Sequence, residues 1–425
     1  MMSDSFSPSS MFTVAFALAL LAGTILKFWL ASRQIRHVAL HRNAVPGRFS
    51  ETVTLAAHQK AATYTIAKTR FGLLEMALGV AVLLAWTLLG GLDALNGALL
   101  EKLGPGMVQQ LALLMAFALA SGAIDLPLAW YQTFVIEERF GFNKTSPRLW
   151  FMDLLKSALV GALIGLPIAS LILWLMGTAG TWWWLWAWAA WMAFNLLLLM
   201  FYPTFIAPLF NKFKPLEDET LKSRVNALMQ RCGFSAKGLF VMDGSKRSAH
   251  ANAYFTGFGA AKRVVFYDTL LAKLSPDEVD AVLAHELGHF KHRHIIKRIV
   301  SMFGLSLGGF ALLGWLSTQA WFYTALGVQP NIVAAAPNDA LALLLFMLVL
   351  PVFGVLVTPL FAQISRRYEF EADAYAVAQT SGADLSGALL KLYEDNASTL
   401  TPDPVYVKFY YSHPPASERL TRMAA

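Results

Sequence analysis

The chain has 425 residues, of which 56% are hydrophobic and only 14% are charged, and its formal net charge is +7. Soluble domains carry about a quarter charged residues, so this composition excludes an ordinary soluble globular enzyme. The single cysteine, Cys232, excludes an internal disulfide framework and any multi-cysteine metal cluster. The excess of positive charge has to be compared with membrane topology before nucleic-acid binding is considered.

Seven stretches are apolar enough to cross a bilayer as helices, because the hydrocarbon core needs about 20 apolar residues in a helix. We expect the first stretch to be a retained anchor, since no basic segment precedes it as in a cleaved signal peptide. Pro351 and Pro359 are expected to kink the seventh. In chain order, the stretches cover residues 11–30, 71–92, 107–130, 157–176, 182–202, 299–322 and 340–365.

Basic residues are concentrated in alternate loops. The segments after the first, third, fifth and seventh spans are rich in Lys and Arg, whereas Lys102 is the one basic residue in the other loops and the N-terminal tail. Basic loops stay in the cytoplasm, so we expect the N-terminus outside and the C-terminus inside. Topology thus explains the positive charge, and we expect a lipid bilayer as surroundings and no nucleic-acid partner. The Ala- and Leu-rich chain, which has no evident organelle signal, is typical of a bacterial inner-membrane protein with a periplasmic N-terminus.

This pattern predicts four parts. Residues 1–202 hold five spans, 203–298 form a cytoplasmic insertion, 299–365 hold two more spans, and 366–425 form a cytoplasmic tail. Neither soluble piece is comfortably a domain by itself, so we expect the two to pack together. Within the insertion, we predict a helix over 216–232 and then strands at the segments GLFVMD, NAYFTG and KRVVFYD.

The insertion ends in AVLAHELGHFKHRH, residues 281–294, which holds four of the nine histidines. Before it, Ser275, Pro276 and Glu278 predict a helix N-terminus with a capping box. His285 and His289 are four residues apart and therefore share one helix face. Both can aim a ring nitrogen at one metal ion.

Glu286 lies one position along this helix, where it can reach a water molecule at such a metal. The H-E-x-x-H pattern is typical of zinc peptidases. The alternative is the polar face of a helix beside the membrane. We expect His292 and His294 to be interfacial residues that flank the sixth span, and not ligands.

Catalytic zinc usually has three protein ligands, so a third ligand of the type His, Glu or Asp is expected elsewhere. The segment SRRYEFEADAYA, residues 365–376, follows the seventh span on the same side of the membrane. Glu369 and Asp373 share a helix face there; Glu369 can bind zinc while Asp373 orients a ligand histidine. Glu371 is expected to point elsewhere. The alternative is a charged helix start after a membrane span, and for this segment alone it would be preferred.

These motifs resemble the Ste24-type CAAX prenyl protease family, which are integral-membrane zinc peptidases of the M48 class. The resemblance covers nearly the whole chain and includes IEERFGFNKTSPRLWFMDLLK, SAHANAYFTGFG, HELGH, SRRYEFEADAYA and YSHPPASERL. It implies a mainly α polytopic membrane protein, with seven transmembrane helices around a large chamber and a cytoplasmic, zincin-like α+β metallopeptidase domain. It also implies one zinc ion and a peptide or protein substrate that is lipidated or membrane-bound.

The resemblance assigns roles to individual residues. It implies that His285, His289 and Glu369 bind zinc and that Glu286 is the general base. It further implies that Asn252 and Tyr254 line the substrate channel, that His413 stabilises the oxyanion, and that Arg419 lies at the site, where its guanidinium can contact substrate or hold the C-terminal segment. Without the resemblance, His413 would be interpreted as a surface histidine in a turn.

Other functions remain open at this stage. The first is an HtpX-like protease for membrane-protein quality control, against which the seven spans and the full-length resemblance argue. The second is a metal-ion transporter or an inactive scaffold. A transporter is expected to carry ionisable residues in the middle of its spans, and the fourth to seventh spans have none there.

Overall fold

The computed structural model describes residues 7–234, 238–256, 263–331 and 337–423. Within these residues the fold is mainly helical, and its strands form one small sheet. The elements are α1 (Pro8–His41), α2 (Leu55–Trp86), α3 (Gly91–Leu103), α4 (Met107–Tyr131), α5 (Pro147–Thr178), α6 (Trp183–Phe201), α7 (Ala207–Phe210), β1 (Phe213–Pro215), α8 (Glu219–Arg231), β2 (Gly238–Met242), β3 (Ala253–Thr256), β4 (Arg263–Tyr267), α9 (Asp268–Leu271), α10 (Pro276–Lys291), α11 (His294–Leu316), α12 (Ala320–Thr324), α13 (Asp339–Gly354), α14 (Thr358–Gln379), α15 (Gly382–Asp395), α16 (Pro404–Tyr410) and α17 (Ala416–Met423).

Seven helical segments of the described chain are long and apolar enough to cross a membrane, as predicted. Three of the helices, α1, α2 and α5, are much longer than the apolar stretches. α1 has 34 residues and is therefore about 50 Å long, whereas a bilayer core is about 30 Å thick. The second span was predicted over 71–92, but α2 starts at Leu55, where Thr54 caps it, and ends at Trp86. Hydropathy identifies the apolar part of such a helix but not its polar extension.

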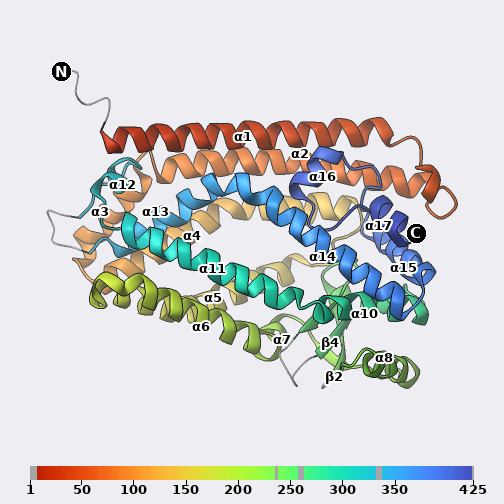
Figure 1. Cartoon of the computed structure of the whole chain (residues 1–425). Coiled ribbons are helices and arrows are strands. Elements are labelled where there is room, and N and C mark those ends of the chain that lie inside the picture. Colours follow the sequence, from red (N-terminus) through yellow and green to blue (C-terminus); the bar gives the residue numbers. More distant parts are fainter. Residues whose placement is uncertain (1–6, 235–237, 257–262, 332–336, 424–425) are drawn as a thin grey trace.

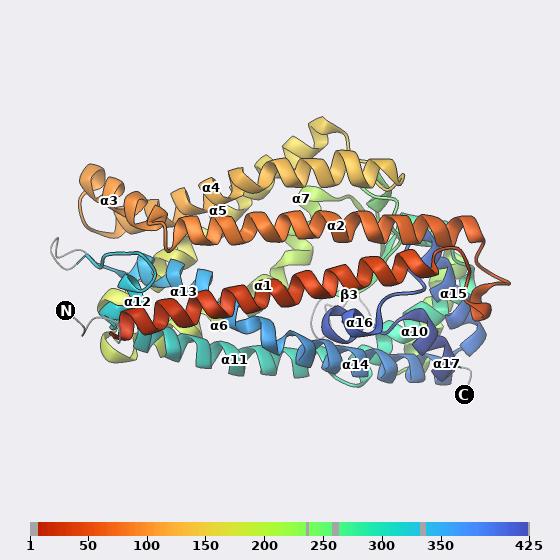
Figure 2. The ribbon, with the colours of Figure 1, turned by 90° about the horizontal axis from the view of Figure 1, so that it is seen from above.

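The long helices run side by side along the molecule (Figure 1). α3 and α12 lie at the end of the molecule where the chain starts, and β2, β4, α8, α10, α15 and α17 lie at the opposite end. Seen from above, α16 lies beside α1 and α14 near that second end (Figure 2). The soluble elements therefore form a cap on one end of the helical bundle.

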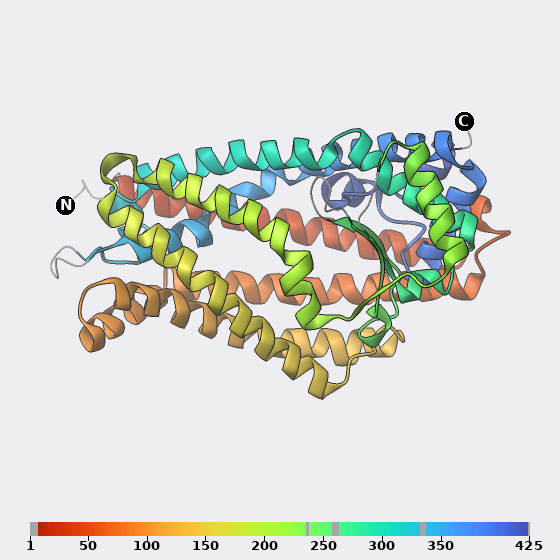
Figure 3. The ribbon, with the colours of Figure 1, turned by 90° about the horizontal axis from the view of Figure 1, so that it is seen from below.

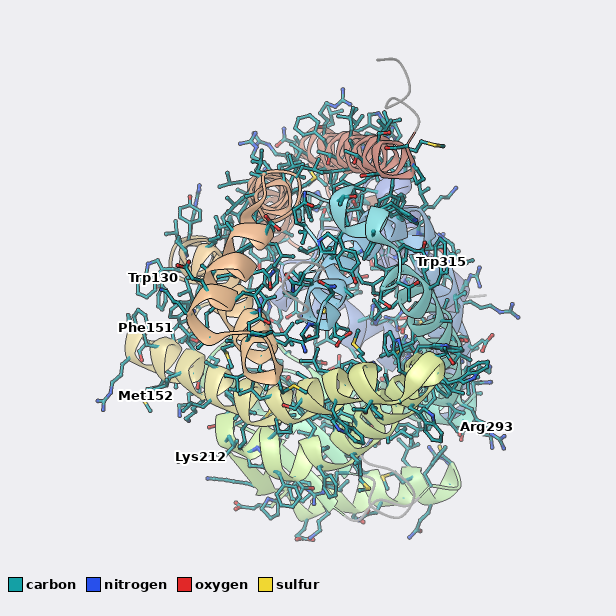
Figure 4. All side chains as sticks on the ribbon, turned by 90° about the vertical axis from the view of Figure 1, so that its left-hand side faces the viewer. Trp130, Phe151, Met152, Lys212, Arg293 and Trp315 are labelled. Carbon is teal, nitrogen blue, oxygen red and sulfur yellow. The ribbon has the colours of Figure 1, made fainter. Side chains whose placement is uncertain are left out.

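Large apolar side chains cover the outside of the bundle. Trp130, Phe151, Met152 and Trp315 lie at its rim in the end view (Figure 4), and each is at least 36% exposed. Apolar side chains that face outward from long apolar helices are expected to meet lipid. The chain is thus an integral membrane protein.

The seventh span has a break at the position where prolines were predicted to kink it. α13 ends at Gly354, a 3₁₀ turn covers Val355–Val357, and α14 continues to Gln379. Pro351 and Pro359 lie on either side of this turn. The span therefore continues as α14 into the soluble cap.

The sheet has the strand order β1-β2-β4-β3 and lies at the capped end (Figure 3). β2 and β4 are parallel, while β1 pairs with β2 and β3 pairs with β4 in antiparallel fashion. β2, β3 and β4 match the three predicted strands, apart from Gly257 and Lys262, which lie outside the described residues. β1 was not predicted, because its three residues are too few to show a pattern.

One hydrophobic core joins the insertion and the tail. Leu283 and Leu287 of α10 pack in it with Ala376 of α14 and with Leu385 and Leu389 of α15. The insertion and the tail bury their apolar faces against each other. They are therefore two parts of a single folded unit, although two spans separate them in the sequence.

Candidate metal centre and catalytic cavity

The residues at the N-terminus of α10 fix where this helix begins. The Ser275 hydroxyl accepts a hydrogen bond from the backbone N–H of Glu278 at 3.3 Å, and the Glu278 carboxylate accepts one from the backbone N–H of Ser275 at 2.7 Å. This is the predicted capping box. Lys391 of α15 also binds the Glu278 carboxylate at 2.7 Å. The helix start is therefore held both locally and by the tail.

Three predicted ligands meet where α10 packs against α14. Nε2 of His285 and Nε2 of His289 lie 3.3 Å apart. Each of these nitrogens lies 3.4 Å from an oxygen of Glu369. One donor atom from each of the three residues lies within 4.8 Å of the others, so they form a group that can hold one metal ion.

The chemistry of this group fits a metal ion of the zinc type. Two imidazole nitrogens and one carboxylate oxygen are an established ligand set for catalytic zinc. Oε2 of Glu369 is buried and has no hydrogen-bond partner, which is costly for a carboxylate unless a cation satisfies it. The donor set and the unsatisfied oxygen both indicate a bound cation.

Asp373 and Arg419 support His285 from the side away from this group. Oδ1 of Asp373 lies 2.9 Å from Nδ1 of His285, and Nε of Arg419 donates to Oδ2 of Asp373 at 2.8 Å. Asp373 therefore lies where an outer partner of a ligand histidine was predicted.

Arg419 was predicted to contact substrate or to hold the C-terminal segment, and its surroundings agree with the second role. It is 6% exposed, and its guanidinium is directed at Asp373, with one nitrogen 3.4 Å from Nδ1 of His285. A buried guanidinium needs an anionic partner, and in the folded chain the carboxylate of Asp373 is that partner. Arg419 thus holds the tail and Asp373 in place and does not line the catalytic cavity.

A cavity of about 730 Å³ opens beside His289 and Glu369. Glu286 lines it together with Tyr254 of β3 and Arg298 of α11. Burial raises the pKa of Glu286 above its ordinary value. Asn252 is exposed and its side chain accepts from the backbone N–H of Ala253 at 2.8 Å, and it is not among the described residues that line this cavity.

His413 also lines this cavity and lies in the segment between α16 and α17. Its Nε2 lies 3.4 Å from Oε1 of Glu369, and its Nδ1 lies 3.0 Å from the hydroxyl of Ser412. The side chain is 65% exposed, so it borders open space and not packed protein. The structure thus brings His413 to the same carboxylate as the two helical histidines.

His294 was predicted to be an interfacial residue and not a ligand, and Glu371 was predicted to point away from the metal. Neither belongs to the group of three candidate ligands, but His294 is not interfacial and contacts His289. His294 is buried, with its Nδ1 3.0 Å from Nδ1 of His289 and its Nε2 2.9 Å from Oε2 of Glu371. Sequence reasoning missed these contacts because Arg293 adopts a left-handed backbone conformation, with φ 56°, between α10 and α11. Helical periodicity cannot be continued across such a turn. His292, in contrast, is exposed as predicted.

Two more cavities lie beyond the catalytic one. A cavity of about 470 Å³ shares Ser412 and His413 with it. A third, of about 570 Å³, lies among α1, α2 and α13 and shares Lys68 and Tyr406 with the second. The three cavities thus follow one another, through shared lining residues, from the candidate metal centre to helices α1, α2 and α13.

Comparison with known proteins agrees with this arrangement. The family model described as "CAAX prenyl protease N-terminal, five membrane helices" matches residues 34–212, and the model described as "Peptidase family M48" matches residues 215–425.

Relatives with the same architecture span almost the whole chain. A CAAX prenyl protease 1 homolog of Arabidopsis thaliana is 33% identical over 93% of each chain, and that of Homo sapiens is 31% identical over 92% of this chain and 91% of its own. The crystal structure of S. mikatae Ste24p superimposes with a TM-score of 0.90 at 31% identity and covers 97% of this chain and 99% of its own. The chain therefore belongs to the CAAX prenyl proteases of peptidase family M48 and is a membrane-embedded metallopeptidase.

Proposed function

We propose that the chain is a zinc endopeptidase in which His285, His289 and Glu369 bind one zinc ion, Glu286 is the general base and His413 is an oxyanion donor. The convergence of three donor atoms within 4.8 Å at the edge of a cavity is the observation that carries this proposal. When bound, zinc supplies positive charge that polarises a peptide carbonyl and makes water more acidic.

Glu286 is placed to handle the protons of the reaction. It follows ligand His285 directly and lines the catalytic cavity, where a water molecule and the substrate carbonyl have to meet. Burial raises the pKa of Glu286, and a carboxylate with a higher pKa is a stronger base. A base of this kind accepts a proton from the attacking water and can then donate it to the leaving amine.

His413 faces the same space from the tail. Desolvation lowers the pKa of His413, although Glu369 opposes the shift. The lowered pKa favours the neutral ring. The Ser412 hydroxyl can donate to Nδ1, which leaves the proton on Nε2, the nitrogen that faces Glu369. A neutral imidazole in this tautomer can donate a hydrogen bond to the oxygen on which negative charge develops.

The edge strand of the sheet supports a substrate-binding role for Asn252 and Tyr254. β3 is the last strand in the order β1-β2-β4-β3, and Tyr254 on this strand lines the catalytic cavity. An extended peptide can pair with an edge strand through main-chain hydrogen bonds. Asn252 stands just before β3, where it can contact the end of such a peptide.

The substrate class follows from the relatives, which are named CAAX prenyl proteases. We therefore take prenylated C-terminal peptides as the substrate, with the lipid in the cavities that lead from the site into the bundle. Coverage of 93% of the Arabidopsis relative favours this over HtpX-like quality control. A transporter or an inactive scaffold has no comparable support.

The alternation of basic residues supports a cytoplasmic metal centre and an N-terminus on the other side. A bacterial inner membrane stays a prediction from composition alone, because the relatives compared here are eukaryotic.

The test uses the purified full chain in lipid nanodiscs. It should cleave a farnesylated C-terminal peptide faster than the same peptide without the lipid, lose activity to a zinc chelator and regain it with added zinc. Equal cleavage of both peptides would contradict the substrate class. Cleavage that survives complete removal of zinc would contradict the mechanism.

A further inference from the structure

A chain of hydrogen-bonded polar side chains leads away from the candidate ligand His289. The proposed function assigns no role to these side chains. His294 is 2% exposed and lies between His289 and Glu371. The two ring Nδ1 atoms of His289 and His294 are 3.0 Å apart, and Nε2 of His294 is 2.9 Å from Oε2 of Glu371. Tyr368 stacks on His294 with a ring separation of 4.1 Å. The ring of His294 is thus fixed in both position and plane.

The end of this chain determines where each proton lies. An ionised carboxylate only accepts hydrogen bonds, so Nε2 of His294 has to donate to Glu371. Nδ1 of neutral His294 is then an acceptor, and Nδ1 of His289 has to donate to it. The free nitrogen of His289 is consequently Nε2, which faces His285 and Glu369. Every bond in the chain selects the tautomer of His289 that can bind a metal.

The other histidine ligand has a shorter support of the same kind. Asp373 bonds Nδ1 of His285 directly and is itself held by Arg419. Glu371 is likewise held by an arginine, since Nε of Arg367 lies 3.2 Å from its Oε1. Each histidine therefore has a carboxylate behind it, and for His289 the ring of His294 spans the extra distance.

The backbone is shaped to put His294 in this place. Arg293 has a φ of 56°, a backbone conformation that residues other than glycine rarely adopt. α10 has ended just before it and α11 begins directly after it at His294. The exposed Arg293 points away from the bundle in the end view (Figure 4), while the next residue is buried against α14. An unfavourable local conformation persists when the surrounding contacts stabilise it.

We infer that His294 and Glu371 are positioning residues that hold His289 in its metal-binding orientation and tautomer. The inference rests on the proposed zinc site. Outer partners of ligand histidines typically change metal affinity by about 10–100-fold, so removal of the His294 ring should weaken zinc binding by such a factor.

A set of variants separates this role from simple packing. His294→Leu fills the space with no hydrogen-bonding group. His294→Asn keeps an oxygen that can accept from His289, and Glu371→Gln keeps an oxygen that can accept from His294. His292→Asn is the matched control. This neighbouring histidine is exposed and stacks on the ring of His294 at 5.6 Å, but the described contacts include no hydrogen bond from it to His289.

The measurement is zinc dissociation from the purified full chain by competition with a chelator, together with thermal unfolding of the zinc-free protein. We expect His294→Leu to lose about 10–100-fold in zinc affinity, His294→Asn and Glu371→Gln to lose clearly less, and His292→Asn to match the wild type. Unfolding of the zinc-free His294→Leu protein should stay close to that of the wild type.

The outcomes are distinct. Zinc affinity of His294→Leu equal to that of the wild type would overturn the inference and leave the proposed function standing. Equal losses in the Leu and Asn variants, with zinc-free proteins that unfold early, would also overturn it in favour of packing. A wild-type protein without zinc affinity would overturn the proposed function and this inference together.

Discussion

Gly288 of α10 lies directly against Ala372 of α14. A Cβ atom on Gly288 would stand 2.9 Å from Cα of Ala372 and 3.1 Å from its carbonyl oxygen, both of which are backbone atoms that cannot move aside alone. Gly288 lies between the candidate ligands His285 and His289 in the sequence, and Ala372 follows the candidate ligand Glu369 by three residues. The distance between these two helices therefore sets the distance between the ligands.

Gly288→Ala should push α10 and α14 apart and so weaken the metal site. Overpacking of this kind typically costs about 1–3 kcal/mol of stability. We expect lower zinc affinity and a lower unfolding temperature, measured by chelator competition and thermal unfolding. Gly304→Ala on α11 is the control, because a Cβ there has no atom within 4 Å. Wild-type values for both properties in Gly288→Ala would show that the close approach is not needed.

Glu286→Gln should separate catalysis from metal binding. The amide has the shape of the carboxyl group but cannot accept a proton, and Glu286 is not one of the three grouped ligands. Loss of a general base typically costs about 10²–10⁴-fold in rate. We expect wild-type zinc content by metal analysis with kcat reduced by such a factor. Cleavage at the normal rate would exclude Glu286 as the base.

Glu369→Ala and Asp373→Ala should weaken zinc binding to different extents. Glu369 offers a donor atom to the metal group, whereas Asp373 contacts Nδ1 of His285 from outside it. Loss of a ligand should abolish zinc retention under a chelator, while loss of an outer partner should cost about 10–100-fold in affinity. Full zinc occupancy of the Glu369 variant in the presence of the chelator would exclude Glu369 as a ligand.

Much of this site could be predicted because its signals are local. The capping box at Ser275 fixes the helical phase, and the four-residue spacing of His285 and His289 then places both rings on one face. The same spacing singled out Glu369 and Asp373. The spans followed from hydropathy, and the break in the seventh followed from its prolines.

The remaining parts depend on contacts between distant segments. The burial of Arg419 depends on the packing of α17 against α14, which no local pattern encodes. His294 reaches His289 because Arg293 interrupts the helix with a left-handed backbone conformation between α10 and α11, and Arg is a residue that gives no signal for such a turn. The helix of the second span starts at Leu55, before the predicted start of the span at 71, because a polar segment extends α2 ahead of its apolar part.

Membrane orientation can be tested by cysteine labelling. Cys232 is the single cysteine, so one substitution, Cys232→Ala, gives the required background. Thr181→Cys lies in the exposed turn before α6, and is preferable to a change at Gly180, which has a φ of 64°. Thr181→Cys and Ala425→Cys should react with an impermeant maleimide from opposite sides of intact membrane vesicles, with Ala425 on the cytoplasmic side. Labelling of both from one side would contradict the proposed topology.

His413→Ala tests the oxyanion role and completes the separation of functions within the site. A donor that acts only in the transition state should lower kcat when removed, by about 10²–10³-fold, and leave zinc content and KM nearly unchanged. Ser412→Ala should cause a smaller loss, because the hydroxyl next to Nδ1 only favours the tautomer that carries its proton on Nε2. Steady-state kinetics and metal analysis of the two variants distinguish an oxyanion donor from a surface histidine and from a metal ligand. An unchanged kcat in His413→Ala would make it a surface histidine beside the cavity, and a parallel loss of zinc would make it a metal ligand.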